Sequence, residues 1–401
     1  MRVFVADKFE DAGIEGLKSL GCEVAYEAAL KGDALAKAVR DSAPEVLIVR
    51  STQAPRGLLE ASPSLELVVR AGAGVNTIDV AAASALGVYV ANCPGKNSIA
   101  VAELAFGLLL SLDRRIPENV SSLKEKKWNK KEFSKARGLH GRTLGVIGLG
   151  QIGQEMALRA RAFGMKVVGW SRSLTPEKAA ELGITRAASP EDVARVSDAV
   201  SVHVAAAQST KGLCGKRFFT AMKEGTIFLN TARADVVDEA ALIEAVRTKG
   251  VRAGLDVFTG EPAEGTGTCD VELSRTPGVY VTHHIGASTD QAQMAIAQET
   301  VRIVRVYRET GEVPNCVNLR TKSKASHMLV VRHRDRVGVL AAILDVLRAS
   351  EINVQEMENV LFEGGDSACA RIRVDREVPA AAVERIRESH AEILAVRAIR
   401  L

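Results

Sequence analysis

The sequence predicts an α/β protein made of two doubly wound parallel-sheet domains and one small βαββαβ domain. Three stretches of the 401 residues carry this prediction. In residues 1–95 and again in residues 142–281, short apolar strands alternate with amphipathic helices, which is the pattern of parallel sheets with helical crossovers. In residues 327–401 the order changes to strand, helix, two strands, helix and strand.

The first stretch contains four apolar runs that predict buried strands. They lie at residues 3–5, 24–25, 46–49 and 65–69. Residues 98–112 follow as an almost uniformly apolar run with Glu103 as its only charge. This run predicts a long helix buried on most faces, and such a helix can also carry a subunit contact.

The second stretch predicts six strands and therefore a Rossmann-type sheet beside the flavodoxin-like first one. The strands are expected at residues 143–147, 166–170, 199–203, 226–230, 254–257 and 279–282. One helix over residues 287–310, with Ser288 as its candidate N-cap, would lead the chain back to the first sheet. We therefore expect residues 1–95 and 285–318 to form one discontinuous domain and residues 96–284 to form the other.

Residues 319–326 have no apolar periodicity and predict a linker. Beyond this linker we expect strands at residues 328–331, 353–361, 368–374 and 396–401 and helices at 339–350 and 379–389. This order is typical of small regulatory modules.

The composition is that of a folded globular protein with a small-molecule ligand. Hydrophobic residues make up 47% and charged residues 25% of the chain, and the formal net charge is only +4. Because Lys and Arg are spread among Asp and Glu, nucleic acid is not an expected partner, whereas the mild positive excess favours a small anionic ligand.

Cysteine usage and hydropathy indicate a reducing compartment. The six cysteines lie far apart and form no C-x-x-C pair, so neither a metal site nor a disulfide framework is expected. The first ten residues already carry Asp7, Lys8 and Glu10, and no uncharged apolar run reaches the ~18 residues that span a bilayer. We therefore expect a cytoplasmic protein without membrane contact.

A glycine-rich turn follows the first strand of the second stretch. Its sequence is Gly148-Leu149-Gly150-Gln151-Ile152-Gly153, between an expected strand and an expected helix. Gly148 permits the tight turn, Gly150 lets the backbone approach a pyrophosphate, and Gly153 lets the helix pack on the strand. Glycines also occur in turns for geometry alone, but the surrounding strand, helix and second strand favour a dinucleotide site.

The end of the next strand leaves the choice of dinucleotide open. An acidic residue normally binds the ribose 2′-hydroxyl of NAD about 20 residues after the glycines. Here Ser171 and Arg172 occupy that place, and a hydroxyl with a guanidinium suits the 2′-phosphate of NADP. The alternative is that Ser171 serves NAD and Arg172 is merely solvated. The sequence therefore predicts NAD or NADP.

Three later strands end in residues suited to oxidising an alcohol. Arg233 follows one strand, Glu261 lies beyond the next, and His283 and His284 follow the third. Removal of hydride from an alcohol carbon requires a base for the hydroxyl proton, a partner that orients the base, and a cation for a substrate carboxylate. Since ligands bind at the carboxyl ends of the strands in an open α/β sheet, we expect the site there.

Taken together, these motifs resemble those of the D-isomer-specific 2-hydroxyacid dehydrogenases, and most closely the phosphoglycerate dehydrogenase branch of that family. The resemblance covers nearly the whole chain. Besides the glycine turn, its motifs are Val69-Arg70-Ala71-Gly72-Ala73-Gly74-Val75, Asn230-Thr231-Ala232-Arg233, Asp256-Val257-Phe258 with Glu261-Pro262, and His284-Ile285-Gly286-Ala287-Ser288.

The resemblance implies a role for each catalytic candidate. Arg233 would bind the substrate carboxylate, His284 would exchange the proton, and Glu261 would hold His284 and raise its basicity. His283 is the rival base, but the family's Gly-Ala-Ser follows His284 at the expected offset. Asp256 would lie near the nicotinamide. The expected cofactor contacts are Gly148, Gly150, Gln151, Ile152, Gly153, Ser171, Arg172, Val204, Thr231, Ala232, Arg233, Asp256, His284, Gly286 and Ala287.

Substrate contacts are likewise implied by the resemblance. Arg50 would meet a phosphate, although it can instead be a surface residue, and Lys130 would reach across from a neighbouring subunit. The full set is Arg50, Ser51, Thr52, Ala73, Gly74, Asn97 and Lys130. Two departures from the family pattern are Ala234-Asp235 after Arg233 and Val204-Ala205 after His203, and Asp235 adds negative charge near an anion site.

The terminal module resembles an ACT domain. His333, Asp335, Gly338 and Asn353 fall at the positions that would bind an amino-acid effector. Asp335 stands where the family has Asn, so a structural dimerisation module is an equal alternative.

The resemblance implies an enzyme that transfers hydride from 3-phosphoglycerate to NAD(P)⁺, giving 3-phosphohydroxypyruvate in serine biosynthesis, as a homodimer or homotetramer. One alternative is a glyoxylate or hydroxypyruvate reductase. An alternative from another class is a non-catalytic, NAD(H)-sensing protein similar to a corepressor.

Overall fold

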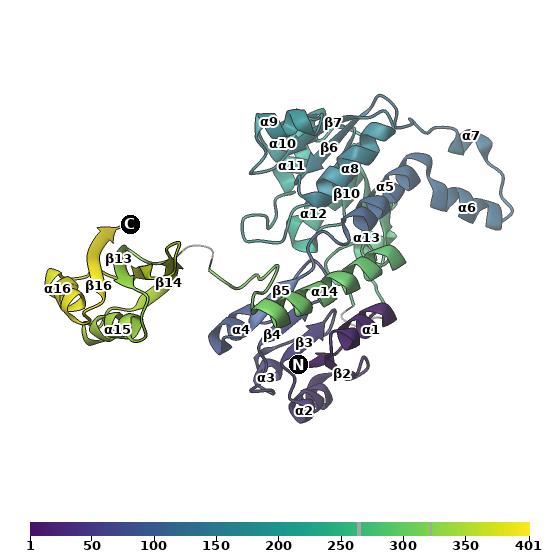
Figure 1. The fold of residues 1–401 in the computed structure, drawn as a ribbon. Coiled ribbons are helices and arrows are strands. Elements are labelled where there is room, and N and C mark those ends of the chain that lie inside the picture. The colour runs from purple at the N-terminus through teal and green to yellow at the C-terminus, as the bar shows by residue number, and fades with distance from the viewer. Residues whose placement is uncertain (263–265, 321–322) are drawn as a thin grey trace. The chain divides into compact units, whose positions relative to one another are not determined.

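The computed structural model describes residues 1–262, 266–320 and 323–401. The chain divides into a larger unit, residues 1–318, and a smaller unit, residues 319–401 (Figure 1). The linker predicted over residues 319–326 falls at the start of the smaller unit, and its residues 321–322 lie outside the described residues.

The larger unit begins with a five-stranded parallel sheet in the order β2-β1-β3-β4-β5. Its strands and helices are β1 (Arg2–Val5), α1 (Asp11–Ser19), β2 (Glu23–Tyr26), α2 (Gly32–Ser42), β3 (Val46–Val49), α3 (Arg56–Leu59), β4 (Leu67–Arg70), α4 (Val80–Leu86) and β5 (Tyr89–Asn92). The sequence prediction omits β5, a four-residue strand that comes soon after the left-handed Gly87 at the end of α4.

The long helix α14 (Asp290–Thr310) packs against α1 and contributes to the core of the first sheet. Its buried Ile296 and Ile303 share one core with Val3 and Val5 of β1. The prediction that Ser288 caps this helix is wrong. Thr289 has the extended backbone of an N-cap, and its side chain accepts a hydrogen bond from the Ala292 amide at 3.2 Å.

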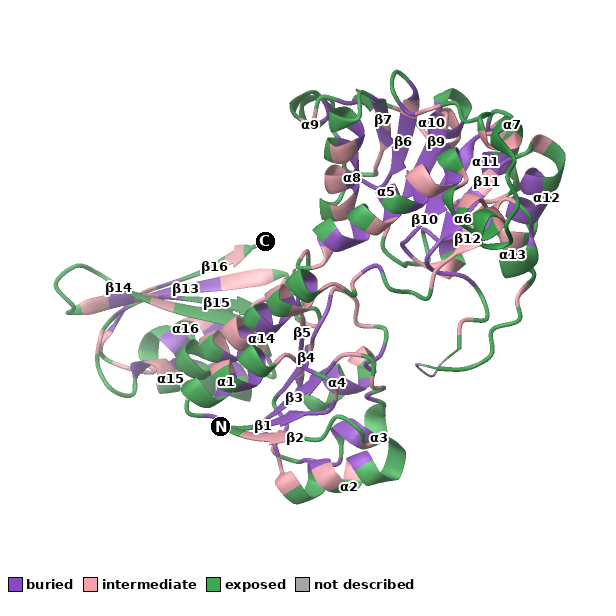
Figure 2. Ribbon diagram, turned by 90° about the vertical axis from the view of Figure 1, so that its right-hand side faces the viewer, coloured by how far each residue is buried: buried purple, intermediate pink, exposed green. Residues whose placement is uncertain are grey.

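The second sheet has seven parallel strands in the order β12-β11-β10-β9-β6-β7-β8. Its elements are β6 (Thr143–Ile147), α8 (Gln151–Ala162), β7 (Lys166–Trp170), α9 (Pro176–Glu181), β8 (Thr185–Arg186), α10 (Pro190–Val196), β9 (Ala199–Val202), α11 (Lys216–Ala221), β10 (Ile227–Asn230), η1 (Ala234–Val236), α12 (Glu239–Lys249), β11 (Arg252–Leu255), α13 (Glu272–Arg275) and β12 (Val279–Val281). The two-residue edge strand β8 is absent from the sequence prediction. Figure 2 shows that the inner strands of both sheets are buried, whereas the edge strands β2, β8 and β12 are more exposed.

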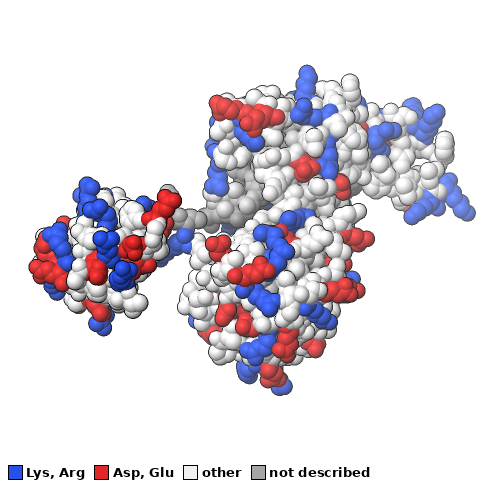
Figure 3. Space-filling view, in the orientation of Figure 1, with Lys and Arg blue, Asp and Glu red and all other residues white. Residues whose placement is uncertain are grey.

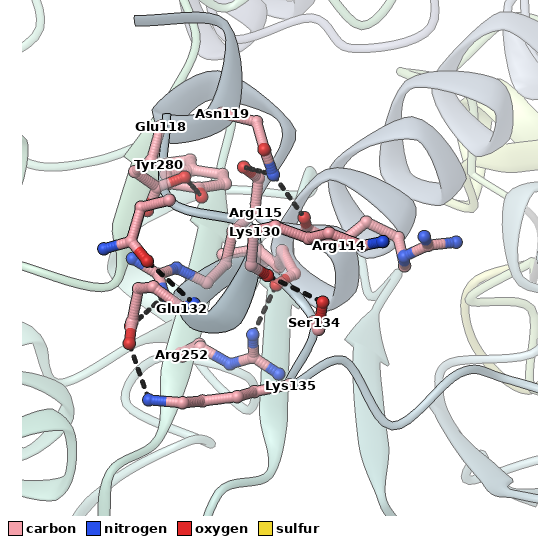
Figure 4. A network of polar contacts seen from close by, with 12 residues as sticks. Arg114, Arg115, Glu118, Asn119, Lys130, Glu132, Ser134, Lys135, Arg252 and Tyr280 are labelled. Atoms are coloured by element: carbon pink, nitrogen blue, oxygen red, sulfur yellow. Dashed lines mark hydrogen bonds and ion pairs between the residues drawn. The ribbon is translucent and has the colours of Figure 1, made fainter. Parts of the chain in front are cut away.

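The predicted buried helix is α5 (Ser98–Arg114), which packs on α8, β10 and β11. It continues into an arm formed by α6 (Ile116–Lys124) and α7 (Lys130–Phe133). Polar contacts hold the base of the arm: Arg115 pairs with Glu132 at 2.7 Å, and the Tyr280 hydroxyl of β12 donates to Glu118 (Figure 4). No helix within the described ranges is long and apolar enough to cross a bilayer.

The smaller unit has the predicted βαββαβ order. Its elements are β13 (His327–Arg334), α15 (Val339–Ala349), β14 (Val354–Leu361), β15 (Ser367–Val374), α16 (Ala380–Glu388) and β16 (Ile393–Arg400). The four strands form an antiparallel sheet in the order β14-β15-β13-β16, with alternate residues of β13 and β15 buried under the two helices. The predicted fold class of two parallel-sheet domains and one small βαββαβ domain is therefore confirmed.

Phe228→Ala should lower the free energy of unfolding of the larger unit by about 3–5 kcal/mol. Phe228 is fully buried, and its ring centroid lies 6.1 Å from that of Phe218 and 5.1 Å from that of Phe219. Both tryptophans of the chain, Trp128 and Trp170, belong to this unit, so their fluorescence during urea titration reports its unfolding.

The matched control is Leu158→Ala, because this side chain of α8 is 60% exposed. The control should change the free energy of unfolding by less than about 0.5 kcal/mol. Equal losses in the two variants would contradict the packing described.

Candidate active site

Three neighbouring strands bring the catalytic candidates to one edge of the second sheet. β10, β11 and β12 run parallel and in register, so their carboxyl ends lie side by side. Arg233 follows β10, Asp256 follows β11, and the loop with His283 and His284 follows β12. The topology therefore collects residues that are about 50 positions apart in sequence into one place.

Asp256 anchors the histidine loop. Its side chain is 1% exposed, and its Oδ1 accepts hydrogen bonds from the Thr282 hydroxyl at 2.6 Å and the Ile285 amide at 2.9 Å. Its Oδ2 accepts from the Gly286 amide at 2.8 Å. These bonds hold His284 in the left-handed region, at φ 54°, where a non-glycine residue needs support. Asp256 thus acts on the loop, a role that the sequence did not predict.

His284 pairs with Glu261 across this loop. The His284 Nδ1 lies 2.7 Å from Glu261 Oε2, and Glu261 Oε1 accepts from the Phe258 amide at 2.8 Å. The hydrogen bond with Glu261 outweighs burial and raises the pKa of His284. Burial alone would raise the pKa of Glu261, but its hydrogen bonds from His284 and Phe258 hold that pKa below its usual range. His283 makes no side-chain hydrogen bond to the described residues, so the geometry favours His284 as the base.

Asn230 shapes the turn that carries Arg233. Its side chain is 1% exposed, donates to the Arg233 carbonyl at 2.9 Å and accepts from the Ala232 amide at 3.0 Å. The Arg233 guanidinium lies next to Gly74, which follows strand β4 of the first sheet. A Cβ added at Gly74 would lie 2.8 Å from Arg233 Nη2. Asp235 is exposed and forms no ion pair with Arg233 in the described part of the chain.

Three arginines converge on this place. Burial, followed by repulsion from Arg233 and Arg50, lowers the pKa of Arg70. None of the three guanidinium groups has a carboxylate partner within salt-bridge distance among the described residues. Gly72 makes room for Arg70, because a Cβ there would lie 1.6 Å from its Nη1. Such a cluster of cations without carboxylate partners favours an anionic ligand. Arg70 was quoted in the sequence motif but not assigned to the site.

A carboxylate at the end of β1 fixes the loop that carries Arg50. Asp7 Oδ2 accepts from the backbone amides of Arg50, Ser51 and Thr52 at 2.6, 3.1 and 3.0 Å. Its Oδ1 accepts from the Ser51 and Thr52 hydroxyls at 3.3 and 3.0 Å. The hydroxyls predicted to touch substrate therefore hold the loop in place. The only sequence signal for Asp7 is an acid two residues beyond the first strand.

The glycine turn has the geometry of a phosphate cradle. A Cβ at Gly148 would lie 2.5 Å from the His203 carbonyl oxygen, and a Cβ at Gly153 would lie 2.0 Å from that of Gly148. Gly150 has open space on its Cβ side and begins α8 without a side-chain cap. The first N–H groups of α8 are thus left for a ligand's phosphate. Gln151 and Ile152 both lie in the first turn of α8. The Gln151 side chain packs against Gly95, and Ile152 is partly buried against the hydrophobic core.

Buried polar atoms without a partner fit bound cofactor and substrate. Among the described side chains they include Thr231 Oγ1, His203 Nδ1, Asn97 Oδ1 and Arg70 Nε. All four belong to segments that border the glycine turn, the Arg233 turn or the arginine cluster. Burial lowers the pKa of His203 to about 3, so this imidazole is neutral. The other two such atoms among the described side chains are Thr77 Oγ1 and Arg142 Nε. Because orphaned buried groups are costly, the four that border the turns and the cluster fit a ligand site.

Other predicted contacts lie at the same edge. Val204 lies beside Gly148, Ala232 donates to Asn230, and Gly286 donates to Asp256. The Ala287 carbonyl accepts from the Gln293 amide group at 2.6 Å, and the Ala73 carbonyl accepts from Asn92 at 2.5 Å. Ser171 and Arg172 directly follow β7, the neighbour of β6.

Lys130 is not brought to this place. It lies exposed on α7, where several lysines gather on the arm (Figure 3), and it lines a hollow of about 340 Å³ with Arg114, Trp128 and Phe133. No hydrogen bond among the described residues joins Lys130 to Arg50, Arg70 or Arg233.

Within the described smaller unit, no hydrogen bond joins the four effector candidates to one another. His333 is 1% exposed, and its ring nitrogens lie 2.8 Å from the Arg334 carbonyl oxygen and 3.1 Å from Asn359 Oδ1. The Asn353 amide donates to Asp375, and the Asp335 amide donates to the Asp366 carbonyl. Gly338 begins α15 with φ 94°. His333 already has partners within its own unit.

The cradle, the His284–Glu261 pair and the arginine cluster define a dinucleotide-binding protein that holds a small anion beside a titratable imidazole. Comparison with known proteins gives the family. Residues 106–286 match the model described as D-isomer specific 2-hydroxyacid dehydrogenase, NAD binding domain. The chain belongs to the D-isomer-specific 2-hydroxyacid dehydrogenase family, and the resemblance found in the sequence is confirmed.

Relatives in this family cover most of the chain. It is 37% identical to the D-3-phosphoglycerate dehydrogenase of Methanocaldococcus jannaschii, over 80% of this chain and 60% of that protein. It is 38% identical to the enzyme of the same name from Mycobacterium bovis, over 88% of this chain and 66% of that protein. The chain thus spans less than two thirds of these curated relatives. A crystal structure of a Thermus thermophilus protein has a TM-score of 0.69 at 31% identity, over 79% of this chain and 100% of that one.

Glu261→Gln should lower the pKa of His284, because the hydrogen bond with the Glu261 carboxylate is the main cause of its elevation. NMR titration of the histidine ring protons in the full chain measures this change. Glu272→Gln is the control, since Glu272 pairs with Arg247 on the same lobe. An unchanged His284 titration in Glu261→Gln would show that the pair is not formed in solution.

Proposed function

We propose that the chain is a nicotinamide-dependent D-2-hydroxyacid dehydrogenase that interconverts 3-phosphoglycerate and 3-phosphohydroxypyruvate. The observation that carries this proposal is that Arg233 lies close enough to act electrostatically on both Arg70 and the His284–Glu261 pair, while Arg50 also acts on Arg70. A substrate with a carboxylate at one end and a phosphate dianion at the other matches three cations in charge. The names of the curated relatives agree with this substrate.

The protein's own groups supply the acid, the base and the cations. Arg233 holds the substrate carboxylate, which places the reacting carbon at the strand ends. With Nδ1 bonded to Glu261, His284 has Nε2 free to take the hydroxyl proton. Glu261 stabilises the imidazolium that results. A nicotinamide cofactor held at the glycine turn would supply the hydride acceptor for oxidation and the hydride donor for reduction.

The direction of the His284 shift affects the pH dependence. Reduction of the 2-oxo acid needs the protonated imidazole, and oxidation of the alcohol needs the neutral one. Since the pKa of His284 is raised, the proton is retained to higher pH, which favours reduction near neutrality and oxidation in alkaline solution.

Arg50 and Arg70 hold the phosphate in this proposal, while the backbone at Ala73 and Gly74 and the side chain of Asn97 border the carboxylate. The Arg70 guanidinium lies over Gly72, where a Cβ would come within 1.6 Å of its Nη1. Lys130 would add a cation only from the arm of a second copy, in a homodimer or homotetramer.

The test is a comparison of kcat/KM for 3-phosphoglycerate, glycerate and hydroxypyruvate on the full chain, with NAD(H) and NADP(H). We expect kcat/KM for 3-phosphoglycerate to exceed that for glycerate and for hydroxypyruvate. If kcat/KM for glycerate and hydroxypyruvate equalled that for 3-phosphoglycerate, the result would instead favour the reductase alternative. No nicotinamide absorbance change with any of these acids would favour the non-catalytic, nucleotide-sensing alternative.

His284→Ala should reduce kcat by roughly 10²- to 10⁴-fold, because it removes the acid–base group. Steady-state nicotinamide absorbance measures the loss. His283→Ala is the matched control, since it removes the adjacent exposed imidazole and should keep kcat within a few-fold. If the His283 variant carried the larger loss, the base would be misassigned.

Arg50→Ala should reduce kcat/KM for 3-phosphohydroxypyruvate by about 10- to 100-fold, the size expected for one charge-assisted phosphate contact. It should change kcat/KM for hydroxypyruvate, which lacks the phosphate, much less. Arg56→Ala, at an exposed arginine paired with Glu60, is the control. Equal losses with both substrates in Arg50→Ala would argue against phosphate binding.

A further inference from the structure

The turn after β7 lies directly beside the phosphate cradle. The Gly148 amide donates to the Trp170 carbonyl at 2.8 Å, which joins the glycine turn to the last residue of β7. The chain then closes a turn in which the Leu174 amide donates to the Ser171 carbonyl at 3.2 Å. Arg172 therefore occupies the second position of a turn next to the cradle.

This turn is firmly held. Leu174 is buried, and its carbonyl accepts a hydrogen bond from Arg186 Nε of β8 at 2.9 Å. The short strand β8 thus stabilises the turn after β7, a role that the sequence did not predict. Because both ends of the turn are fixed, the direction in which the Arg172 side chain leaves the backbone is also constrained.

The Arg172 side chain leads away from the turn to a second loop. Its Nη1 donates to the Ser209 hydroxyl at 3.0 Å, in the loop between β9 and α11. Both groups are exposed, and Ser171 and Ser173 add two further hydroxyls on the turn. No described carboxylate lies within salt-bridge distance of Arg172.

The chemistry of this place disfavours an unmodified adenosine ribose. A ribose diol is usually held by a carboxylate that accepts from its 2′-hydroxyl. Between Ser171 and Pro176 the chain has no acid, and Glu177 is the first one, in the first turn of α9. A guanidinium with neighbouring hydroxyls instead matches a phosphate monoester.

We infer that Arg172 and Ser209 form a binding site for the 2′-phosphate of the adenosine ribose, so that this chain selects NADP(H) over NAD(H). The inference rests on the proposed function, since it requires a dinucleotide in the glycine cradle. It adds the cofactor preference and assigns Ser209, which no sequence motif marks.

The site is exposed, which sets how it should respond to solution conditions. Salt screens an exposed ion pair, so the preference for the phosphorylated nucleotide should weaken as ionic strength rises. A phosphate monoester loses its second charge below about pH 6, so the preference should also weaken under acid conditions.

Calorimetric titration of the full chain with ADP-ribose and with 2′-phospho-ADP-ribose tests the inference without relying on turnover. The wild-type chain should bind the phosphorylated fragment about 10-fold or more tightly than ADP-ribose. Arg172→Gln should remove most of that ratio and leave the affinity for ADP-ribose nearly unchanged. Ser209→Ala should reduce the ratio by a smaller factor.

Arg195→Gln is the matched control, because it removes another exposed arginine, paired with Asp192 in α10 of the same sheet domain. It should keep the wild-type ratio. Equal affinity of the wild-type chain for the two fragments, or an unchanged ratio in Arg172→Gln, would overturn the inference while leaving the dehydrogenase proposal intact. If neither fragment bound, the dehydrogenase proposal would fail together with it.

Discussion

The candidate site depends on one buried carboxylate. Asp256, at the end of β11, accepts hydrogen bonds from Thr282, Ile285 and Gly286. Each such bond to a charged group contributes roughly 1.5–3 kcal/mol, enough to hold His284 in a left-handed conformation. In that conformation the imidazole Nδ1 lies 2.7 Å from Glu261 Oε2. The link between β11 and β12 therefore positions the base beside the carboxylate that raises its pKa.

In the remainder of the site, glycines leave space for the guanidinium groups of the arginines. Gly72 lies under the Arg70 guanidinium, and Gly74 faces that of Arg233. Asp7 uses its carboxylate on the backbone of residues 50–52 and so positions Arg50 without neutralising its side chain. The resulting excess of positive charge is costly in an empty site and favourable in one that binds an anion. This is the arrangement expected of a protein that recognises a charged 2-hydroxy acid.

The sequence predicted the features that are local in the chain. The glycine turn, most strands and the βαββαβ order each have short-range signals, and their order placed Arg233, Glu261 and His284 at one sheet edge. The sequence did not predict the contacts between segments that are far apart in the chain. Asp7 holds a loop 43 residues away, and Ser209 meets Arg172 across 37 residues. β8 has only two residues, and the choice between Ser288 and Thr289 as N-cap depends on backbone conformation, so neither has a sequence signal.

The most direct test of the account is the single-turnover rate of nicotinamide oxidation with saturating 3-phosphohydroxypyruvate, compared between the wild-type chain and Asp256→Asn. The asparagine keeps the shape but presents an amide group to one of the three donors. The account predicts turnover by the wild-type chain and a roughly 100-fold slower rate in the variant, with dinucleotide binding retained, because a small displacement of the base is sufficient for such a loss. A wild-type rate in Asp256→Asn, or no turnover by the wild-type chain, would contradict it.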